Sequence, residues 1–409
     1  MKYVIIGNSA AGIGAVEGIR QADKKGEVTV VASEPHHTYS RPLISYLLLG
    51  KTSEEKMKYR GDGFYKENGC DLLAGVSVKE INSGKKSVAL DNGKSISYDK
   101  LLVATGSTAF VPPFEGLDTV KDKCTFMSLD DARQLEGYLG AEKRVLIIGA
   151  GLIGLKCAEG IAGSVSHITV IDLAPRILSS ILNDDGAKIV QNHIESRGVE
   201  FRLAASVKRF EKDTAILDSG ETIGFDILVL AVGVRPNTSL LKDIAKIDKG
   251  IIIDAKSKTT AADIYAAGDC TQTLDISSGQ NRIMALLPNA YMQGECAGIN
   301  MAGGEKEFDK AIPMNAIGFF GLHVITAGNY TGDVYSETEN TNYKRLFYSG
   351  NKLNGYIMIG NVEKAGIYTS LIKEQTPLDS IDFALVCERP GLMAFTKEDR
   401  QIKLGGKAK

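Results

Sequence analysis

The feature that most constrains the fold is a pattern that the chain contains twice. Each copy, at 2–12 and 144–154, is a short β-branched run, then a glycine turn, then a stretch compatible with a helix. A second apolar run follows each copy, at 27–32 and 167–171. This order is typical of a βαβ unit with parallel strands. Because the copies lie about 140 residues apart, the pattern predicts two similar α/β domains rather than a short-period repeat.

The second copy contains a complete Gly-x-Gly-x-x-Gly pattern, formed by Gly149, Gly151 and Gly154. In a dinucleotide site the first glycine makes the turn, the second lets the backbone approach a pyrophosphate, and the third permits helix–strand packing. Asp172 ends the following strand, where an acid accepts a hydrogen bond from an adenosine ribose. Its charge would repel a 2′-phosphate and therefore favours NADH, while Arg176 leaves NADPH as the alternative.

The first copy departs from this pattern at its centre. Ser9 stands in the place of the second glycine, between Gly7 and Gly12. A small residue still permits close approach, and Glu34 can take the ribose role. By itself, this segment is equally compatible with an ordinary tight turn between a strand and a helix.

Further apolar runs predict buried parallel strands at 100–104 and 225–231, because both are largely continuous. Glycines follow these runs where the backbone must turn tightly. Asp269 follows a third run, at 263–265, and is either the N-cap of a helix or an acceptor for a ligand hydroxyl.

Proline-containing segments at 112–113 and 235–237 predict linkers on both sides of the second βαβ unit. We therefore expect an α/β fold with two Rossmann-like domains, the second inserted in the first, and a C-terminal α+β domain. The expected divisions are 1–112, 113–236, 237–310 and 311–409, with 237–310 returning to the first domain.

The C-terminal part has a different texture. Residues 345–359 predict a hairpin, and 363–373 a helix. Residues 376–409 contain Pro377 and Pro390 and end in a Lys-rich tail, which is expected to be solvated or disordered.

Charge and composition exclude several classes of function. The 48 basic and 50 acidic side chains give a net charge of −2, without the basic surplus that nucleic acids or anionic membranes attract. No apolar run approaches the roughly 18 residues of a membrane span. The apolar stretch at the N-terminus is too short for a secretory signal, so a cytoplasmic location is expected. Neither cysteines nor histidines show the spacing of metal ligands.

Taken together, these motifs resemble the two-dinucleotide-binding flavoprotein reductases of the pyridine nucleotide-disulfide oxidoreductase superfamily. The resemblance covers roughly residues 1–310. It also rests on Ala104-Thr105-Gly106, on the segment 232–237 and on Ala266-Ala267-Gly268-Asp269. Within the superfamily, the segment 39–43 is similar to that of NADH-dependent rubredoxin and ferredoxin reductases and of the flavin portion of NADH-dependent nitrite reductases.

The resemblance implies that NADH gives a hydride to FAD and that electrons then leave the flavin. It makes 1–112 and 237–310 the FAD-binding domain and 113–236 the NADH-binding domain. The implied FAD contacts are Gly7, Ser9, Ala11, Gly12, Glu34, Arg41, Pro42, Val78, Ala104, Thr105, Gly106, Gly268, Asp269, Asn289 and Ala290. Of these, Asn289 and Ala290 would open a helix, 290–301, toward the flavin. The implied NADH contacts are Gly149, Gly151, Ile153, Gly154, Asp172 and Gly233.

Two departures from the superfamily pattern are informative. Thiol-dependent relatives carry a redox cysteine in the first domain, but the segment 35–50 contains none and the first cysteine is Cys70. Many relatives also pair a lysine after the Arg-Pro step with a glutamate in the NADH domain. Here these positions are Tyr46 and Lys156. We expect Lys156 to supply the positive charge near the flavin with Tyr46 beside it; the alternative is a Lys156 that faces solvent.

The predicted function is therefore an NADH-dependent FAD oxidoreductase that reduces a small protein such as rubredoxin or a ferredoxin-type iron–sulfur protein. The lack of a redox thiol disfavours disulfide and peroxide chemistry. Three alternatives stay open: an NADH oxidase, the flavin subunit of a larger metalloenzyme, and a slow regulatory protein that binds FAD and NADH.

Overall fold

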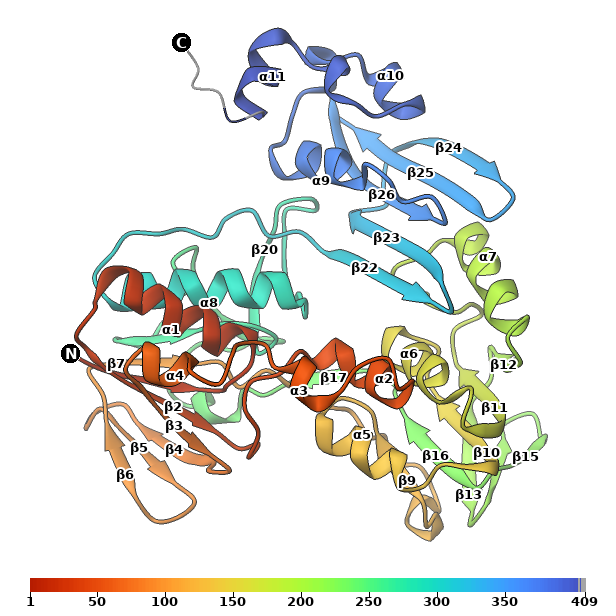
Figure 1. Ribbon diagram of the computed structural model, residues 1–409, viewed down its shortest axis with the longest axis horizontal. Coiled ribbons are helices and arrows are strands. Elements are labelled where there is room, and N and C mark those ends of the chain that lie inside the picture. The colour runs from red at the N-terminus through yellow and green to blue at the C-terminus, as the bar shows by residue number, and fades with distance from the viewer. Residues whose placement is uncertain (404, 406–409) are drawn as a thin grey trace. The chain divides into compact units, whose positions relative to one another are not determined.

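The computed structural model describes residues 1–403 and 405 (Figure 1). These residues group into two compact units. The first unit comprises Met1–Ser180, Ile194–Thr273 and Asn281–Asp309. The second comprises Ile181–His193, Leu274–Gln280 and the described residues from Lys310 onward.

The first parallel sheet of unit 1 has five strands in the order β19-β7-β1-β2-β3. Their bounds are Ile264–Ala266, Lys100–Val103, Lys2–Ile6, Glu27–Ala32 and Cys70–Ala74. Helix α1 (Ala10–Ala22) connects β1 to β2, as the first copy of the sequence pattern predicts. The order places the ends of β1, β7 and β19 side by side, so the loops that follow these strands meet at one edge of the sheet.

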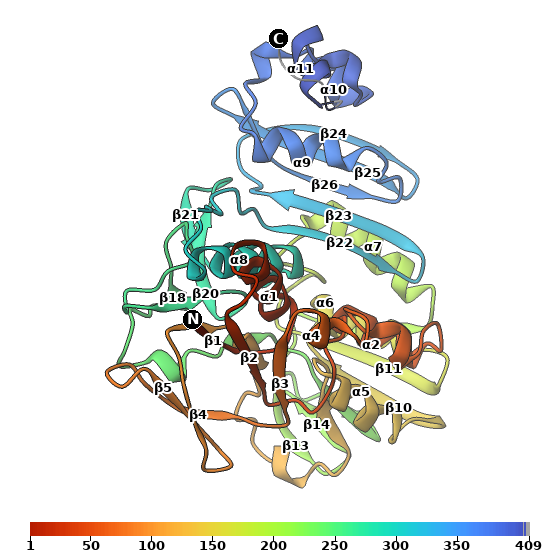
Figure 2. The ribbon, with the colours of Figure 1, turned by 60° about the vertical axis from the view of Figure 1, so that its left-hand side comes forward.

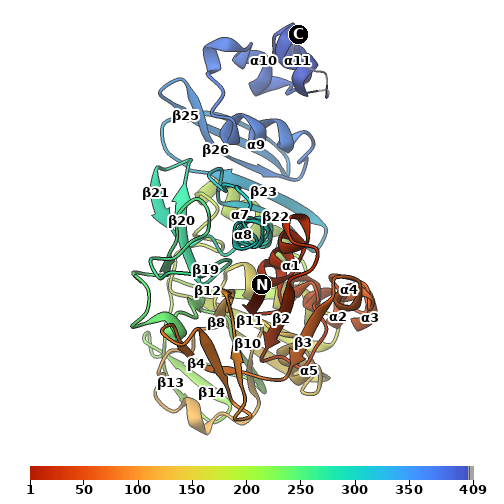
Figure 3. The same cartoon turned by 90° about the vertical axis from the view of Figure 1, so that its left-hand side faces the viewer.

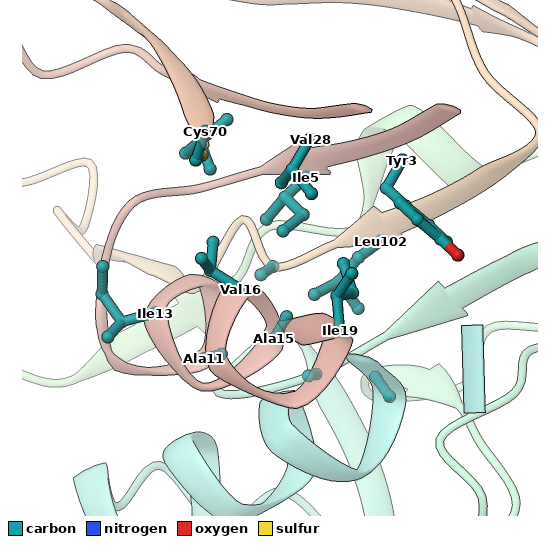
Figure 4. Close-up of a cluster of buried hydrophobic side chains, with 14 of the residues drawn as sticks. Tyr3, Ile5, Ala11, Ile13, Ala15, Val16, Ile19, Val28, Cys70 and Leu102 are labelled. Atoms are coloured by element: carbon teal, nitrogen blue, oxygen red, sulfur yellow. The ribbon is translucent and has the colours of Figure 1, made fainter. Parts of the chain in front are cut away.

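A cluster of buried apolar side chains holds α1 against this sheet. Ile5, Val28 and Leu102 from three strands are fully buried with Val16 and Ile19 of the helix (Figure 4). Burial of side chains of this size contributes roughly 1.5–3 kcal/mol each. The position of the N-terminus of α1 is therefore fixed by packing along the rest of the helix.

Helix α8 (Leu287–Met301) lies side by side with α1 (Figure 3). Each helix contributes two glycines to the contact. A Cβ atom at Gly14 or Gly18 would clash with carbonyl oxygens of α8, and one at Gly294 or Gly298 with carbonyl oxygens of α1. Only glycine allows two helices to approach this closely, and the close packing brings both helix N-termini to the same edge of the sheet.

The second parallel sheet of unit 1 repeats this design, with the order β12-β11-β10-β16-β9. Its strands are Val199–Leu203, Val165–Asp172, Gly140–Ile148, Ile227–Leu230 and Lys123–Thr125. Helix α6 (Leu152–Ile161) connects β10 to β11, and α5 (Leu129–Glu136) follows β9. Each parallel sheet is accompanied in sequence by an antiparallel three-stranded sheet. These are β4-β5-β6 (Val78–Asn82, Ser87–Leu90, Ser95–Ser97) and β13-β14-β15 (Val207–Glu211, Thr214–Leu217, Thr222–Gly224).

The chain crosses between the two Rossmann-like domains through a pair of short strands. Strand β8 (Ser107–Ala109) leads out of the first domain and pairs in antiparallel fashion with β17 (Val234–Pro236), which leads back. The predicted fold class, with one Rossmann-like domain inserted in another, is confirmed. The remaining elements of unit 1 are short, and those before α5 are η1 (Arg41–Leu43), α2 (Ile44–Leu48), α3 (Glu54–Met57), α4 (Phe64–Glu67) and η2 (Leu117–Thr119). After β17 come η3 (Ser239–Leu241) and β18 (Ile251–Ile252).

Unit 2 contains an antiparallel sheet of order β22-β23-β26-β25-β24 (Figure 2). The strands are Met314–Phe319, Leu322–Gly328, Lys352–Ile359, Asn342–Ser349 and Asp333–Glu339, and α9 (Ala365–Lys373) packs on β26. The predicted hairpin and helix are present, with α9 starting two residues late. A three-stranded sheet has β20 (Thr271–Asp275) between β18 and β21 (Gln280–Arg282). Helix α7 spans Asp184–Glu195.

The last stretch of the chain is more ordered than the sequence indicates. It forms η4 (Leu378–Ser380), α10 (Phe383–Glu388), η5 (Leu392–Ala394) and α11 (Lys397–Lys403). Val386, Cys387 and Phe395 are buried in the core of the C-terminal sheet. The disorder expected for the end of the Lys-rich tail concerns 404 and 406–409, which lie outside the described residues. Within the described part of the chain, no helix is both long and apolar enough to cross a bilayer.

Candidate functional site

A groove of about 760 Å³ opens at the edge of the first sheet where β1, β7 and β19 end. Loops after all three strands line it, together with the first turns of α1 and α8. Its size is within the range of small-molecule and cofactor sites. Twelve residues expected from the sequence line it: Gly7, Ser9, Ala11, Glu34, Arg41, Val78, Ala104, Thr105, Gly106, Gly268, Asp269 and Ala290.

Three residues expected at the cofactor do not line this groove. Gly12 instead packs under the turn, where a Cβ would clash with the carbonyl oxygen of Gly7. Pro42 lies in η1, and Asn289 is buried within α8. Helix α8 begins at Leu287 rather than at Ala290, because a proline fits the first turn of a helix, where its missing N–H is not needed.

The turn after β1 fits a phosphate. Gly7 has a φ of +118°, and a Cβ at this position would clash with the carbonyl oxygen of Ala104. Ser9 is the N-cap of α1 and its side chain makes no capping hydrogen bond. The first turn of the helix also has no acidic residue. A helix N-terminus with free amides and no competing negative charge is suited to an anion such as a pyrophosphate.

Glu34 and Arg41 form an ion pair in the groove. Tyr39 donates a hydrogen bond to Oε2 of Glu34 at 2.7 Å, and the Arg41 guanidinium binds Oε1. Arg41 also donates to the carbonyl oxygen of Met127 at 3.3 Å, and its guanidinium lies 5.2 Å from the centre of the Tyr39 ring. This pair thus offers one cation and one carboxylate to a ligand.

Asp269 provides a second carboxylate in the groove. Burial raises the pKa of this carboxyl above its ordinary value, and the Ser107 hydroxyl at 3.4 Å and the Arg41 charge only partly oppose the shift. The preceding backbone is fixed by Gln293 of α8, whose Oε1 accepts from the amide of Gly268 at 2.8 Å. A buried carboxylate with few partners is suited to accept hydroxyl groups of a ligand.

Asn237 ties the returning strand to the loop after β7. Its amide group donates to the carbonyl oxygen of Thr105 at 2.9 Å, and its backbone N–H donates to that of Gly106, also at 2.9 Å. The Thr105 hydroxyl donates in turn to the carbonyl oxygen of Asn237 at 2.6 Å. The crossing between the two domains is therefore bonded directly to the groove.

The turn after β10 repeats the geometry of the first. Gly149 has a φ of +114°, and a Cβ at Gly154 would clash with the carbonyl oxygen of Gly149, as one at Gly12 would with Gly7. Gly151 differs, because a Cβ there would meet no protein atom within 4 Å. A Cβ at Gly233 would likewise meet no atom of the described residues within 4 Å. Packing within the described part of the chain therefore does not account for these two glycines, whereas close approach of a ligand would.

Asp172 ends β11, as the sequence predicts. Its Oδ2 accepts from the amide of Ala150 at 2.6 Å, and Oδ1 accepts from that of Ala174 at 2.8 Å. These bonds hold the carboxylate beside the glycine turn. Ile153 lies half-buried in the first turn of α6.

Lys156 and Tyr46 lie together, although they are 110 positions apart in sequence and neither lines the groove. The ammonium of Lys156 is 4.5 Å from the centre of the Tyr46 ring, a cation–π geometry. The Lys156 side chain is only 12% exposed and pairs with Glu159, which is 7% exposed. The alternative of a solvent-facing Lys156 is therefore wrong. Glu159 is not among the site residues expected from the sequence.

All six cysteines are buried and unpaired with one another. Burial raises the pKa of Cys70 and Cys124 to about 12 and that of Cys270 and Cys387 to about 11, and it also raises that of Cys157 and Cys296. Thiols in this state are poor nucleophiles, since the thiolate is the reactive form.

Sequence reasoning missed one wall of the groove. Thr125, Met127, Ser128 and Asp131 of the inserted domain line it. Ser128 and Asp131 form a capping box at the start of α5. The Ser-x-x-Asp spacing predicts a helix start, but no local pattern indicates that this helix faces the first domain.

The comparisons with known proteins agree with this site. Residues 1–294 match the family model described as pyridine nucleotide-disulphide oxidoreductase. The chain belongs to this family. A second model, the rubredoxin NAD+ reductase C-terminal domain, matches residues 313–376. The family makes this protein an FAD-dependent NAD(P)H oxidoreductase with FAD and NADH as cofactors, as the sequence predicts.

Individual relatives of this oxidoreductase differ in how much of their length it covers. The epsilon subunit of the NADH-dependent phenylglyoxylate dehydrogenase of Aromatoleum evansii is 30% identical over 391 residues, 92% of each chain. The NAD(P)H nitrite reductase of Bacillus subtilis is 28% identical over 92% of this chain, which spans only 48% of that protein. The crystal structure of a covalent putidaredoxin reductase–putidaredoxin complex matches with a TM-score of 0.88 at 22% identity, over 100% of this chain and 99% of that one. This last likeness shows the fold.

Proposed function

We propose that the protein passes electrons from NADH through FAD to a small one-electron carrier of the rubredoxin or ferredoxin type. The observation that carries this proposal is the state of the thiols: all six are buried, and none lies in the segment 35–50. Without a thiol relay, electrons leave the protein from the flavin. One NADH supplies two electrons, so each turnover reduces two one-electron carriers and releases one proton.

FAD, when bound, accepts a hydride and releases electrons one at a time, which is the chemistry the protein side chains lack. The chain binds and orients it. We assign the pyrophosphate to the turn at Gly7, Ser9, Ala11 and Gly12, because the N-terminus of α1 there favours an anion. The further assigned contacts are Arg41 and Pro42 toward the pyrophosphate and flavin, Glu34 at the ribose, Val78 at the adenine, Asp269 at the ribityl chain, and Ala104, Thr105, Gly106 and Gly268 along the cofactor.

The first turn of α8 supplies positive potential to the flavin end of the site. We assign Asn289 and Ala290 to its pyrimidine edge, because a helix N-terminus stabilises negative charge. Close packing of α8 on α1 supports this assignment, since it brings both N-termini to one groove.

For NADH we assign the turn at Gly149, Gly151, Ile153 and Gly154, the ribose acceptor Asp172, and Gly233. The open space at Gly151 and Gly233 supports the assignment. The backbone amides that hold Asp172 keep its charge beside the ribose, which favours NADH over NADPH.

Lys156 is proposed to supply positive charge at the reacting end of the two cofactors, with Tyr46 packing beside it. Its low exposure and its contact with Tyr46 of the first domain support this role. Glu159 would then balance the charge of Lys156 when the site is empty.

A second candidate is that the protein works as the flavin subunit of a larger dehydrogenase. The match of 92% of both chains to a subunit of a multisubunit enzyme favours it. The chemistry of the flavin site is the same in both cases, and the identity of the acceptor differs.

The test is anaerobic. The yellow holoenzyme is reduced with one equivalent of NADH, and separate aliquots then receive rubredoxin, a [2Fe–2S] ferredoxin or air. A parallel sample reduced with dithionite separates the acceptor step from the NADH step. We expect rapid bleaching by NADH and reoxidation by a protein carrier that is much faster than by air.

Two outcomes would contradict the proposal. If air reoxidises the flavin as fast as NADH reduces it and no carrier is faster, the protein is an NADH oxidase. If the purified protein contains no flavin and binds none, the assignment of the groove fails. Co-purification of iron–sulfur subunits from the source cells would instead favour the second candidate.

A further inference from the structure

The hydroxyl group of Tyr39 joins two parts of the first unit at the groove. It donates to Oε2 of Glu34 at 2.7 Å and accepts a hydrogen bond from the backbone amide of Leu129 at 2.9 Å. Leu129 is the first residue of α5 in the inserted domain. One phenol oxygen thus connects the carboxylate that we assign to the ribose of FAD with a helix that lies 90 positions further along the chain.

The backbone on both sides of Tyr39 is bonded to a neighbouring segment. The amide of Ser40 donates to the carbonyl oxygen of Met57 at 2.8 Å, and the amide of Tyr59 donates to the carbonyl oxygen of Thr38 at 2.9 Å. Burial raises the pKa of Tyr39 well above its ordinary value. The phenol is therefore protonated at neutral pH, where it donates its hydrogen bond to Glu34.

The remaining capacity of the Glu34 carboxylate suits a diol. A carboxylate has about two acceptor positions on each oxygen. Tyr39 occupies one on Oε2, and Arg41 occupies one on Oε1. One position is left on each oxygen, which matches the two vicinal hydroxyls of a ribose.

We propose that Tyr39 is a positioning residue that fixes the Glu34 carboxylate for the adenosine ribose of FAD. This inference rests on the proposed role of Glu34. The opposing explanation is that Tyr39 only caps α5, where it satisfies one of the amides that every helix leaves open at its start. In that case the loss of its hydroxyl would destabilise the protein without acting through Glu34.

A double-mutant cycle on FAD binding separates these explanations. The apoprotein of the full chain is prepared as wild type, Tyr39→Phe, Glu34→Ala and the double variant, and FAD affinity is measured by quenching of flavin fluorescence. Tyr98→Phe is the matched control, because the Tyr98 hydroxyl is buried in the first domain and has no hydrogen-bond partner among the described residues. Thermal unfolding of each apoprotein is recorded alongside.

If Tyr39 acts through Glu34, Tyr39→Phe raises the Kd for FAD about tenfold, the scale of one hydrogen bond to a charged group. Glu34→Ala raises it at least about tenfold, and the double variant binds within about twofold of Glu34→Ala. Tyr98→Phe leaves the Kd unchanged. The Glu34→Gln variant, which keeps an acceptor for Tyr39, falls between wild type and Glu34→Ala.

The failures are distinguishable. Fully additive effects in the double variant, or a Tyr39→Phe change confined to apoprotein stability, overturn the positioning role of Tyr39 and leave Glu34 in place. An unchanged Kd in Glu34→Ala overturns the assignment of Glu34 to FAD, and with it the proposed function of this part of the groove.

Discussion

At the scale of single residues, the most unusual feature is a buried ion pair within one helix. Lys156 and Glu159 are almost fully removed from solvent, and Tyr46 covers the ammonium. Burying two charges is expensive, and the loss of one partner leaves the other uncompensated. A pair that only served stability would be replaceable by apolar side chains at little cost. Its presence in the helix that follows the Gly149 turn is consistent with a role for the charge itself.

Replacement of Lys156 by methionine tests that role. We expect Lys156→Met to slow flavin reduction by NADH roughly tenfold or more, because a charge-stabilising group is lost, and to lower the flavin potential. It should also destabilise the fold by about 3–5 kcal/mol, because the buried Glu159 carboxylate loses its ion pair with Lys156. Stopped-flow reduction, a redox titration and thermal unfolding measure the three effects.

The double variant Lys156→Met/Glu159→Gln is the control for this experiment. It removes both charges and should regain most of the stability without regaining the rate. Recovery of the wild-type reduction rate and potential in the double variant would mean that Lys156 has only a structural role.

The Asp269 carboxylate is expected to lower the stability of the apoprotein while it strengthens FAD binding. Its folded-state pKa is raised by burial, so the unfolded chain releases this proton at a lower pH than the folded chain does. The stability of the apoprotein therefore falls as pH rises from the ordinary Asp pKa, near 4, through the raised folded value. Above that window the full cost of burying the charge remains.

Asp269→Asn should remove this cost. At pH 7 we expect its apoprotein to be more stable than wild type by about 1 kcal/mol, the common scale of single substitutions. Near pH 4 the difference should vanish. FAD binding should weaken about tenfold, because an amide is a poorer acceptor than a carboxylate. Thermal unfolding at several pH values and FAD titration check both; an apoprotein less stable than wild type at pH 7 would contradict the argument.

At the scale of elements, the turn after β10 separates two constraints of the Gly-x-Gly-x-x-Gly pattern. One is packing within the protein, and the other is close approach of a ligand. A Cβ at Gly154 would clash with backbone, whereas one at Gly151 would meet no protein atom. Gly151→Ala should therefore leave the melting temperature unchanged and raise the KM for NADH about tenfold or more, since it removes close approach to the pyrophosphate. Gly154→Ala should lower stability by about 1–3 kcal/mol through overpacking.

The measurements are thermal unfolding and steady-state kinetics with an artificial acceptor, with dithionite reduction as the control that the flavin site is intact. A Gly151→Ala protein with wild-type KM for NADH would place the nucleotide elsewhere.

Much at this scale is predictable from local sequence. The bounds of β1 and β2 follow from continuous apolar runs. The turns after β1 and β10 follow from Gly7 and Gly149, which adopt positive φ angles that other residues rarely adopt. Helix α10 could not be predicted, because it is short and is stabilised by burial of Val386 in a core formed by distant strands. The bonds from Tyr39 to Leu129 and from Arg41 to Met127 depend on tertiary structure in the same way.

At the scale of the whole molecule, the chain uses one design twice and connects the copies beside the groove. Both parallel sheets carry a glycine turn after a central strand, and in both a Cβ at the last glycine would clash with the carbonyl oxygen of the first. The returning strand β17 ends at Pro236, and the next residue, Asn237, is bonded to the loop after β7. The junction between the two domains thereby lies beside the groove that we assign to FAD.

The same view of the molecule predicts its response to thiol reagents. Every cysteine is buried, and four have pKa values of about 11 or 12. At pH 8 such thiols are ionised to about one part in a thousand or less. Iodoacetamide in excess should therefore leave NADH-dependent ferricyanide reduction by the holoenzyme unchanged over an hour. A colorimetric thiol titration should find fewer than about one reactive thiol in the native protein and all six after denaturation. Activity lost in proportion to alkylation of a single cysteine would show that a thiol does carry electrons. It would contradict direct electron transfer from the flavin to an external carrier.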